Sequence, residues 1–314
     1  MGTNWEEFYA NQPPPNDLDK SAELLKDFVE HQSENVKGVV LVTSGGTTIP
    51  LELNTVRFVD NFSAGTRGSI SAEYFLKNGY AVIFMYRVKS LQPFSRRFSN
   101  QNFFDILELS ETDNKRSAIV SAKYSNHIAE ELFKYRQALK QRKLLEISFT
   151  TLSEYLWLLR SACQVLATLK HRAILYLAAA ASDFYVPSNE MQSVHKIPST
   201  GPPTISLQLV PKMLKPLVSL WVPKAFVISF KLETDETLLI PKARGALENY
   251  NHNLVIANML HTRKQQVVLV SRENDYKISL TNEQMNNGEE IEKYIIEDLI
   301  KKHQDFMKNG NKCS

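Results

Sequence analysis

The chain contains few cysteines: Cys163 and Cys313 are the two in 314 residues. A disulfide framework or a thiolate metal site needs more, so neither is expected to organise the fold. Cys163 belongs to a helical pattern on its apolar side and is predicted to be a packed thiol rather than a nucleophile. The seven histidines are scattered without metal-ligand spacing, which argues against a zinc enzyme.

Several common motifs are also absent. The chain has no G-x-G-x-x-G, no G-x-x-x-x-G-K-[ST], no G-x-S-x-G and no H-E-x-x-H. No apolar run approaches membrane-spanning length, and the first residues lack the pattern of a signal peptide. Net charge is +3, from 37 basic and 34 acidic residues. We therefore expect a soluble, cytoplasmic protein, with the nucleus as an alternative location, and neither nucleic acid nor membrane as a partner.

Hydrophobic runs alternate with helical patterns along most of the chain. This alternation predicts a Rossmann-like, doubly wound α/β fold with a mostly parallel sheet, closed by a β-hairpin and a helix. Residues 110–114 are expected to form a loop and residues 116–142 a helix, and residues 99–143 are assigned no chemistry. The predicted strands cover residues 39–43, 81–86, 173–177, 205–209, 226–231 and 254–257, the hairpin residues 267–271 and 277–281, and the helices residues 20–31, 67–78, 152–166, 211–220, 240–250 and 288–307.

The chain is expected to form a single ligand-binding domain. Residues 1–36 would be a helical N-terminal extension and residues 37–260 the nucleotide- and substrate-binding body. Residues 261–314 would contribute the hairpin and the last helix.

The stretch from residue 39 to residue 68 is the most informative. A buried strand ends at Ser44-Gly45-Gly46-Thr47, and a second small-residue loop, residues 61–68, opens a helix. Loops of this kind place backbone N–H groups where they can hold phosphate oxygens. Tight turns of the same composition also serve as plain connections, so both interpretations remain open.

Two further segments invite alternative interpretations. Four alanines, residues 178–181, leave room at a strand end for a helix or a ligand, and Asp183 after them could bind a ligand or cap a turn. Residues 87–98 carry four positive charges at the end of a strand. For most of these side chains a solvated loop is the better expectation, with one of them contacting an anion.

Longer motifs carry a family resemblance. Residues 42–47 (VTSGGT), residues 56–65 (VRFVDNFSAG) and residues 176–184 (YLAAAASDF) closely resemble eukaryotic phosphopantothenate–cysteine ligases. Ala181 stands where that family would have Val, a conservative departure. Further matches follow in the family's order, so that the resemblance covers roughly residues 38–260. They are HKI at residues 195–197, VPK at 210–212, SFKLETD at 229–235 and AN at 257–258.

The resemblance implies a ligase reaction. A nucleoside triphosphate would activate 4′-phosphopantothenate as an acyl-nucleotidate, and L-cysteine would then form the amide, in the second step of coenzyme A synthesis from pantothenate. ATP with Mg2+ is the expected co-substrate and CTP the alternative, and the Mg2+ ligands are not assigned. The resemblance also implies a homodimer.

It further implies roles for individual residues. Asn61 and Lys196 would be catalytic, with Lys196 closing over the activated intermediate. Arg57 would bind the substrate phosphate from the partner subunit. The nucleotide would be bound by Gly45, Ser63, Gly65, Gly68, Phe230 and Asn258, and the pantothenate arm by Ala179, Ala180 and Asp183.

Two other classes of protein remain as alternatives. A nicotinamide-dependent oxidoreductase needs an acidic residue at the end of the second strand, where this chain has Tyr86-Arg87. A non-catalytic nucleotide-binding regulator would keep the glycine loops without needing Asn61 or Lys196.

Overall fold

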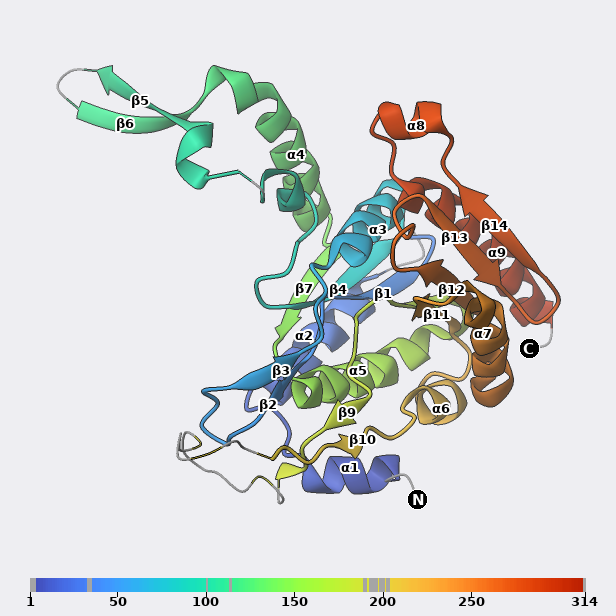
Figure 1. The fold of residues 1–314 in the computed structure, drawn as a ribbon. Helices are drawn as coiled ribbons and strands as arrows, with labels where there is room; N and C mark the ends of the chain where they lie inside the picture. The colour runs from blue at the N-terminus through green and yellow to red at the C-terminus, as the bar shows by residue number, and fades with distance from the viewer. Residues whose placement is uncertain are drawn as a thin grey trace.

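A sheet of eight strands forms the centre of the molecule (Figure 1). The structure is a computed structural model that describes residues 4–32, 36–99, 101–112, 115–188, 191, 197, 201 and 204–312. The pairs β12–β13 and β13–β14 are antiparallel and all other neighbours in the sheet are parallel, as predicted. From edge to edge the strands are β14 (Asp275–Ser279), β13 (Gln266–Val270), β12 (Leu254–Met259), β11 (Phe226–Glu233), β8 (Ala173–Leu177), β1 (Val39–Ser44), β4 (Ala81–Arg87) and β7 (Leu144–Phe149).

Helices cover both faces of the sheet, and alternate residues of β1 belong to different hydrophobic clusters. Val39 and Leu41 pack with α2 (Leu18–His31) and α5 (Leu152–Leu166). Val40 and Val42 pack with α3 (Thr66–Lys77) and α9 (Ile291–Lys312). Every residue of β1 is buried, which is why the strand is a continuous apolar run rather than an alternating one.

Helix α5 begins as its sequence predicts. Thr151 Oγ1 accepts the N–H of Glu154 at 3.1 Å, and Glu154 Oε2 accepts the N–H of Thr151 at 3.1 Å, forming a capping box. Cys163 on this helix is fully buried, and burial raises the pKa of its thiol. The prediction of a packed thiol is confirmed by this burial.

The polar N-terminal segment also contains a short helix that the sequence analysis missed, α1 (Trp5–Asn11). Its apolar residues are too few for a periodic pattern, but Phe8 and Tyr9 are buried against the body. Arg160 of α5 lies over the Tyr9 ring, 4.8 Å from its centroid, and also contacts the ring of Trp5. Cation–π contacts and aromatic burial therefore hold this end of the chain in place.

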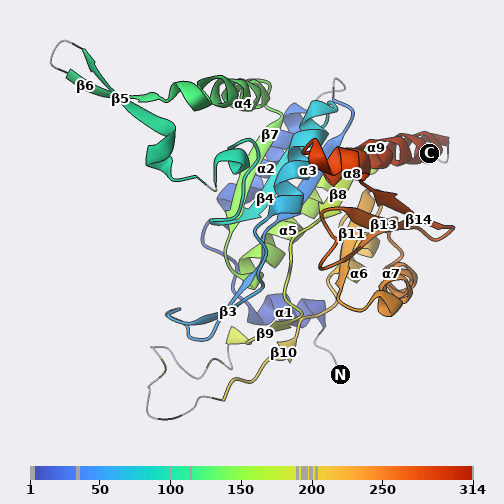
Figure 2. The same ribbon diagram turned by 45° about the horizontal axis from the view of Figure 1, so that its top comes forward.

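An arm projects from the body between β4 and β7 (Figures 1 and 2). It consists of the hairpin β5 (Leu107–Thr112) and β6 (Lys115–Val120), followed by α4 (Ala122–Lys140). The expected loop at residues 110–114 and the helix from residue 116 are therefore wrong at the hairpin: residues 110–112 lie in β5 and the helix begins at Ala122. The hairpin residues whose burial the structure describes, 107–110 and 116–120, are half-buried or exposed, so the sequence lacks the buried alternation by which strands are recognised.

One further helix, α7 (Glu236–Tyr250), packs on β12 and β13 through buried residues that include Leu239 and Ala243. The other remaining elements are short. The predicted strand at residues 205–209 is wrong over its first part, since pairing is confined to Gln208–Leu209. The short strands are β2 (Thr48–Pro50), β3 (Phe58–Asp60), β9 (Phe184–Tyr185) and β10 (Gln208–Leu209). The short helices and turns are α6 (Leu214–Pro216), α8 (Asn282–Asn286), η1 (Ser95–Phe98), η2 (Phe103–Ile106), η3 (Ala167–Arg172) and η5 (Leu217–Trp221).

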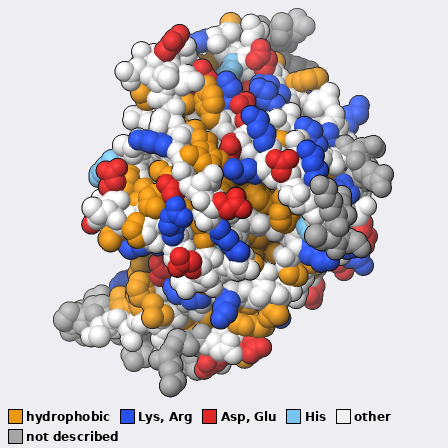
Figure 3. Space-filling view, turned by 90° about the vertical axis from the view of Figure 1, so that its right-hand side faces the viewer, with side chains coloured by type: hydrophobic (Ala, Val, Ile, Leu, Met, Phe, Trp, Pro, Cys, Tyr) orange, Lys and Arg blue, Asp and Glu red, His pale blue; other side chains and the backbone are white. Residues whose placement is uncertain are grey.

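The side of the molecule that carries α7, β14 and α9 has a mixed surface (Figure 3). Basic and acidic side chains alternate there with apolar ones, as the small net charge leads one to expect. Interspersed charges of both signs are typical of an ordinary solvated surface.

Candidate active site

The carboxyl end of β1 is the point where the chain changes direction across the sheet. Strands β4 and β7 follow on one side of β1, and β8, β11 and β12 follow on the other. In open α/β sheets, ligands bind at such a switch point, outside the carboxyl ends of the strands. The two small-residue segments singled out in the sequence, after β1 and after β8, meet there.

Backbone hydrogen bonds join these two segments directly. The N–H of Ala180 donates to the carbonyl of Gly45 at 2.8 Å, and the N–H of Thr47 donates to the carbonyl of Ala180 at 3.2 Å. Thr43 Oγ1 accepts the N–H of Ala179 at 3.1 Å. The alanine-rich segment after β8 is therefore fastened along the loop after β1, which explains its small side chains.

The two glycine loops pack so closely on neighbouring residues that several of their positions have no room for a side chain. Gly45 has φ +86°, and a Cβ there would lie 2.7 Å from the Cβ of Arg87. A Cβ on Gly68, in the first turn of α3, would lie 2.5 Å from the Cβ of Ser44. Gly65, with φ +79°, precedes α3, and its carbonyl accepts Ser44 Oγ at 3.1 Å. The start of α3 thus packs directly on the end of β1, with its first N–H groups at the switch point.

Asn61 lies over the same loop. Its N–H donates to the carbonyl of Thr47 at 3.1 Å, directly after the β2–β3 hairpin. The side-chain amide of Asn61 makes no hydrogen bond to any residue that the structure describes, so it has donors to offer a ligand. Ser63 Oγ accepts the N–H of Gly65 at 3.4 Å. The structure therefore brings together Asn61, Gly45, Ser63, Gly65 and Gly68.

A cavity of about 320 Å³ opens beside this edge, at the ends of β8 and β11. Three of the residues implied by the resemblance, Ala179, Asp183 and Phe230, lie in its wall, which also includes Lys212 and Lys231. Leucines of α5 form an apolar part of the wall. A cavity with an apolar side and two cations suits a flexible polar chain that carries negative charge.

A buried polar pair borders this cavity. Ser229 Oγ lies 2.7 Å from His252 Nε2, and Ser229 is in the cavity wall. Burial lowers the pKa of His252 to about 4, so the imidazole is neutral at physiological pH. Sequence reasoning missed this pair because the two residues lie in different elements, 23 positions apart.

Asn258 lies in β12 opposite Leu232 of the neighbouring strand and is 6 % exposed. It is not in the cavity wall described above. Phe230 packs edge-on against Tyr176, with ring centroids 4.9 Å apart. The two residues expected to hold a base and ribose therefore sit on adjacent strands, and their roles stay predictions.

Arg57 is held within its own chain. Its Nη1 lies 3.2 Å from Glu52 Oε1 and 3.1 Å from the carbonyl oxygen of Ile197. The N–H of Arg57 also donates to Glu52 Oε2 at 2.8 Å and, as the largest contribution, holds the pKa of that carboxyl below its usual range. Arg57 does not line the cavity beside Asp183. Lys196, together with His195, lies outside the described residues.

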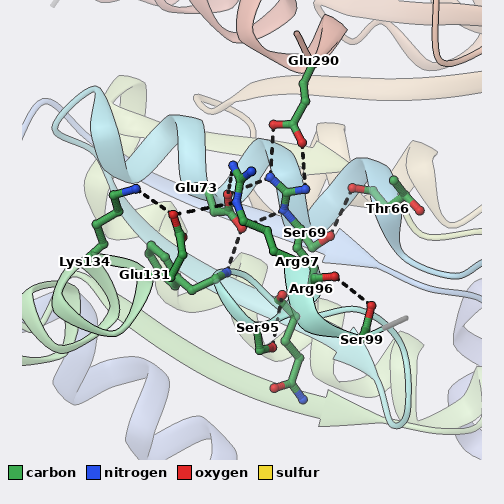
Figure 4. A network of polar contacts seen from close by, with 12 residues as sticks. Thr66, Ser69, Glu73, Ser95, Arg96, Arg97, Ser99, Glu131, Lys134 and Glu290 are labelled. Carbon is green, nitrogen blue, oxygen red and sulfur yellow. Dashed lines mark hydrogen bonds and ion pairs between the residues drawn. The ribbon is translucent and has the colours of Figure 1, made fainter. Parts of the chain in front are cut away.

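The basic segment after β4 agrees with the expected solvated loop at the exposed Lys89 and departs from it at Arg96. Arg96 is 8 % exposed and forms ion pairs with Glu73 of α3 at 2.7 Å and with Glu290 at 2.7 Å (Figure 4). Arg97 lies 3.8 Å from Glu73 and from Glu131. The expectation is wrong for Arg96 because its partners lie 23 and 194 residues away, where no local pattern reveals them.

No group of three or more His, Cys, Asp or Glu residues in the described part of the chain could hold a metal ion. Mg2+ in nucleotide enzymes is usually held by substrate phosphates, waters and one or two carboxylates rather than by a protein cage. The site is compatible with Mg2+ carried by a nucleotide. Among the described residues, no helix is long and apolar enough to cross a membrane.

Fold and site define this chain as a Rossmann-like α/β protein whose candidate site lies at the switch point of the sheet. Residues 160–304 match the family model described as the DNA/pantothenate metabolism flavoprotein C-terminal domain. The chain is 44 % identical over 307 residues to human phosphopantothenate–cysteine ligase, covering 96 % of this chain and 98 % of the human one. It is 38 % identical to the Saccharomyces cerevisiae ligase CAB2, over 97 % of this chain and 87 % of that protein. The chain therefore belongs to the phosphopantothenate–cysteine ligase family of enzymes.

Solved structures agree with this family. A mutant of Cab2 in complex with phosphopantothenate-cysteine superposes with a TM-score of 0.88 at 40 % identity, covering 98 % of this chain and 99 % of that chain. The C-terminal domain of the coenzyme A biosynthesis bifunctional protein CoaBC has a TM-score of 0.53 at 17 % identity, over 89 % of this chain and 100 % of that chain, and shows the shared fold alone. The human and yeast relatives and the Cab2 structure support a ligase and argue against the oxidoreductase alternative.

Proposed function

We propose that this enzyme joins 4′-phosphopantothenate to L-cysteine through an acyl-nucleotidate. A carboxylate oxygen of phosphopantothenate attacks the α-phosphorus of the nucleotide, and the bond to the β-phosphate breaks, releasing pyrophosphate. The amine of cysteine then attacks the acyl carbon, loses a proton, and displaces the nucleoside monophosphate. The observation that carries the proposal is the meeting of the glycine loops, Asn61 and the Ala179–Asp183 segment at one sheet edge.

The chemistry calls for groups of this kind. Activation gathers negative charge from phosphates and a carboxylate at one point, so preorganised N–H donors lower the barrier. The backbone at Gly45, Gly65 and Gly68, with the Ser63 hydroxyl, would hold the phosphates. The Asn61 amide would donate to the carboxylate and then to the acyl-nucleotidate. Phe230 and Asn258 would bind the base and ribose.

The pantothenate arm would occupy the cavity beside Ala179, Ala180 and Asp183. Lys196 would neutralise the activated intermediate, as the family resemblance implies, and would help to exclude water from a hydrolysable acyl group. Mg2+ would enter with the nucleotide and shield its phosphate charge. ATP is the proposed nucleotide, and an assay with CTP in its place tests that choice.

A homodimer completes the proposal. Arg57, whose side chain is 40 % exposed while Glu52 orients it, would bind the substrate phosphate in the site of the partner subunit. Large apolar side chains are exposed in the arm and in the turn before it: Leu109 of β5 at 76 %, and Phe103 at 65 % and Phe104 at 77 % in η2. Apolar surface of this kind is typical of an interface, and we assign it to a second copy of the chain.

The chain would work as one domain, with residues 1–36 as extension, 37–260 as the catalytic body and 261–314 as the closing hairpin and helix. We expect the enzyme in the cytoplasm, with the nucleus as the alternative, which fractionation would decide. The reaction itself is tested by product mass. Phosphopantothenoylcysteine should form when nucleotide, phosphopantothenate and cysteine are all supplied, and omission of any one should abolish it. A product that forms without nucleotide would contradict the proposal.

A further inference from the structure

Arg87 is a charged residue at the switch point to which the family resemblance assigns no role. It ends β4, one residue beyond Tyr86, which pairs with Ser44 of β1. Arg87 therefore emerges at the same sheet edge as Gly45, and its stem packs where a Gly45 side chain would otherwise be. Ser90 continues the same turn, with its Oγ 3.1 Å from the position of a Gly45 Cβ and 3.2 Å from that of a Gly65 Cβ. The turn after β4 thus forms a further wall around the two glycine loops.

The guanidinium of Arg87 is held by the residue that precedes Asn61. Arg87 Nη1 lies 2.7 Å from Asp60 Oδ2, and Asp60 directly precedes Asn61. Asp60 is itself fixed, because its Oδ1 accepts Thr48 Oγ1 at 2.9 Å. One short strand, β3, therefore delivers both Asn61 and the carboxylate that orients Arg87. The Arg87 side chain remains 21 % exposed at this edge.

The hydrogen bonds of Arg87 are incomplete. Its Nε is buried and has no hydrogen-bond partner within the described ranges. Arg67, the basic residue inside the second glycine loop, by contrast uses both of its terminal nitrogens: Nη1 donates to Glu292 Oε1 at 2.9 Å and Nη2 donates to the carbonyl of Arg263. Arg96, further along the same segment, is paired with two carboxylates. Arg87, in contrast, is paired with one carboxylate, that of Asp60, and its Nε–H has no acceptor among the described residues.

We propose that Arg87 contacts the phosphate chain of the bound nucleotide and is a further nucleotide-binding residue of this enzyme. The inference rests on the proposed function. A guanidinium presents five N–H donors in a plane and can hold a carboxylate on one side and phosphate oxygens on the other. Asp60 orients Arg87 before the nucleotide arrives, so that the cation stands at the sheet edge of the Gly45 loop, where negative charge gathers during activation.

The alternative is that the Arg87–Asp60 pair only braces β3 against β4. A double-variant cycle separates the two roles. If the pair is only structural, removing both charges together leaves neither unpaired and costs less stability than removing one. Asp60→Asn with Arg87→Gln leaves no unpaired charge in either strand. If the pair were only a brace, this combination would restore both thermal stability and nucleotide affinity.

The test is a calorimetric titration of the full-length protein with ATP and Mg2+, accompanied by thermal unfolding. We expect Arg87→Gln to weaken ATP binding at least tenfold, with phosphopantothenate binding within twofold of wild type. The double variant should regain thermal stability but still bind ATP at least tenfold more weakly. Arg97→Gln is the matched control, since Arg97 is a half-exposed arginine of the same segment that faces Glu131, and its ATP affinity should be that of wild type.

Two results would overturn the assignment: ATP affinity of Arg87→Gln within twofold of wild type, or recovery of that affinity in the double variant. A wild-type protein that binds neither ATP nor CTP would instead refute the proposed function, and the role of Arg87 with it. If the wild type binds nucleotide normally and Arg87→Gln does so too, the assignment of Arg87 fails while the proposed function stands.

Discussion

The carbonyl oxygen of Asn61 lies directly over Gly46, so close that a Cβ on residue 46 would be 1.6 Å from it. This approach joins the loop after β1 to the strand that delivers Asn61. It is supported by the hydrogen bond from the Asn61 N–H to the Thr47 carbonyl. The placement of the residue to which we assign the central role therefore depends on the absence of a side chain at position 46.

Gly46→Ala is expected to reduce turnover on the order of 100-fold. The added methyl group cannot be accommodated against a backbone carbonyl, so Asn61 must move, and a displacement of about 1 Å in an active site can reduce the rate on the order of 100-fold. Steady-state product formation and thermal unfolding of the purified variant measure the two effects.

Gly245→Ala is the matched control. Gly245 lies within α7, and a Cβ there would meet nothing within 4 Å. Because alanine is a better helix former, this variant should be stabilised by roughly 0.5–1 kcal/mol with unchanged activity. Wild-type activity in Gly46→Ala would show that the contact with Asn61 does not position the site.

Asn61→Asp should block acyl-nucleotidate formation while ATP still binds. The substitution keeps the size of the side chain but replaces an amide donor by a negative charge facing the substrate carboxylate. Pyrophosphate release in a single turnover, measured beside ATP affinity, separates chemistry from binding. Pyrophosphate release at the wild-type rate would be incompatible with the role given to Asn61.

The sequence predicted the elements of the central sheet where they are buried on both faces, as in β1 and β4, because such strands are uninterrupted apolar runs. It failed at β5 and β6, since an exposed hairpin has no buried face to leave a pattern. It also failed for α1, whose seven residues span too few turns to show a period.

For the site, local reasoning reached the glycine loops and Asp183, and family resemblance supplied Asn61, Arg57 and Lys196. The Arg87–Asp60 pair was out of reach because it joins residues 27 positions apart (87 − 60) on strands whose spatial relation the sequence does not state. The burial of Arg96 was missed for the same reason. Local sequence patterns identify the segments that form the ligand site. Which charged side chains are free to contact a ligand depends on tertiary ion pairs that these patterns do not show.

Acid should destabilise the fold through two buried histidines. Burial lowers the pKa of His252 and of His303 to about 4, against 6.5 when exposed. Between pH 6.5 and 4 the unfolded chain therefore binds more protons than the folded one, and stability falls as pH falls through this window. The loss is on the order of 3 kcal/mol per histidine at its acid end.

Urea unfolding of wild type and of His252→Gln at pH 7 and pH 4.5 measures this effect. The variant should lose less stability than wild type on acidification. The exposed His127 provides the control, since His127→Gln should follow the wild-type pH dependence. Equal acid sensitivity of His252→Gln and wild type would show that His252 is protonated equally in both states.

Arg57→Ala and Asn61→Ala should each be inactive alone yet complement each other in mixed dimers. A site built on the Arg57→Ala chain keeps its own Asn61 and borrows an intact Arg57 from its partner. With random mixing about half the dimers are mixed, so about a quarter of all sites should recover. Co-expression followed by product assay measures this, and activity no higher than that of the separate variants would place Arg57 in the site of its own chain.

The most direct test of the whole account is pyrophosphate release in the absence of cysteine. Activation precedes amide formation, so ATP and phosphopantothenate together should release about one pyrophosphate per active site in a rapid burst, and ATP alone should release none. Cysteine should then permit continuous turnover. Pyrophosphate released from ATP alone, or none released until cysteine is added, would contradict an acyl-nucleotidate mechanism for this enzyme.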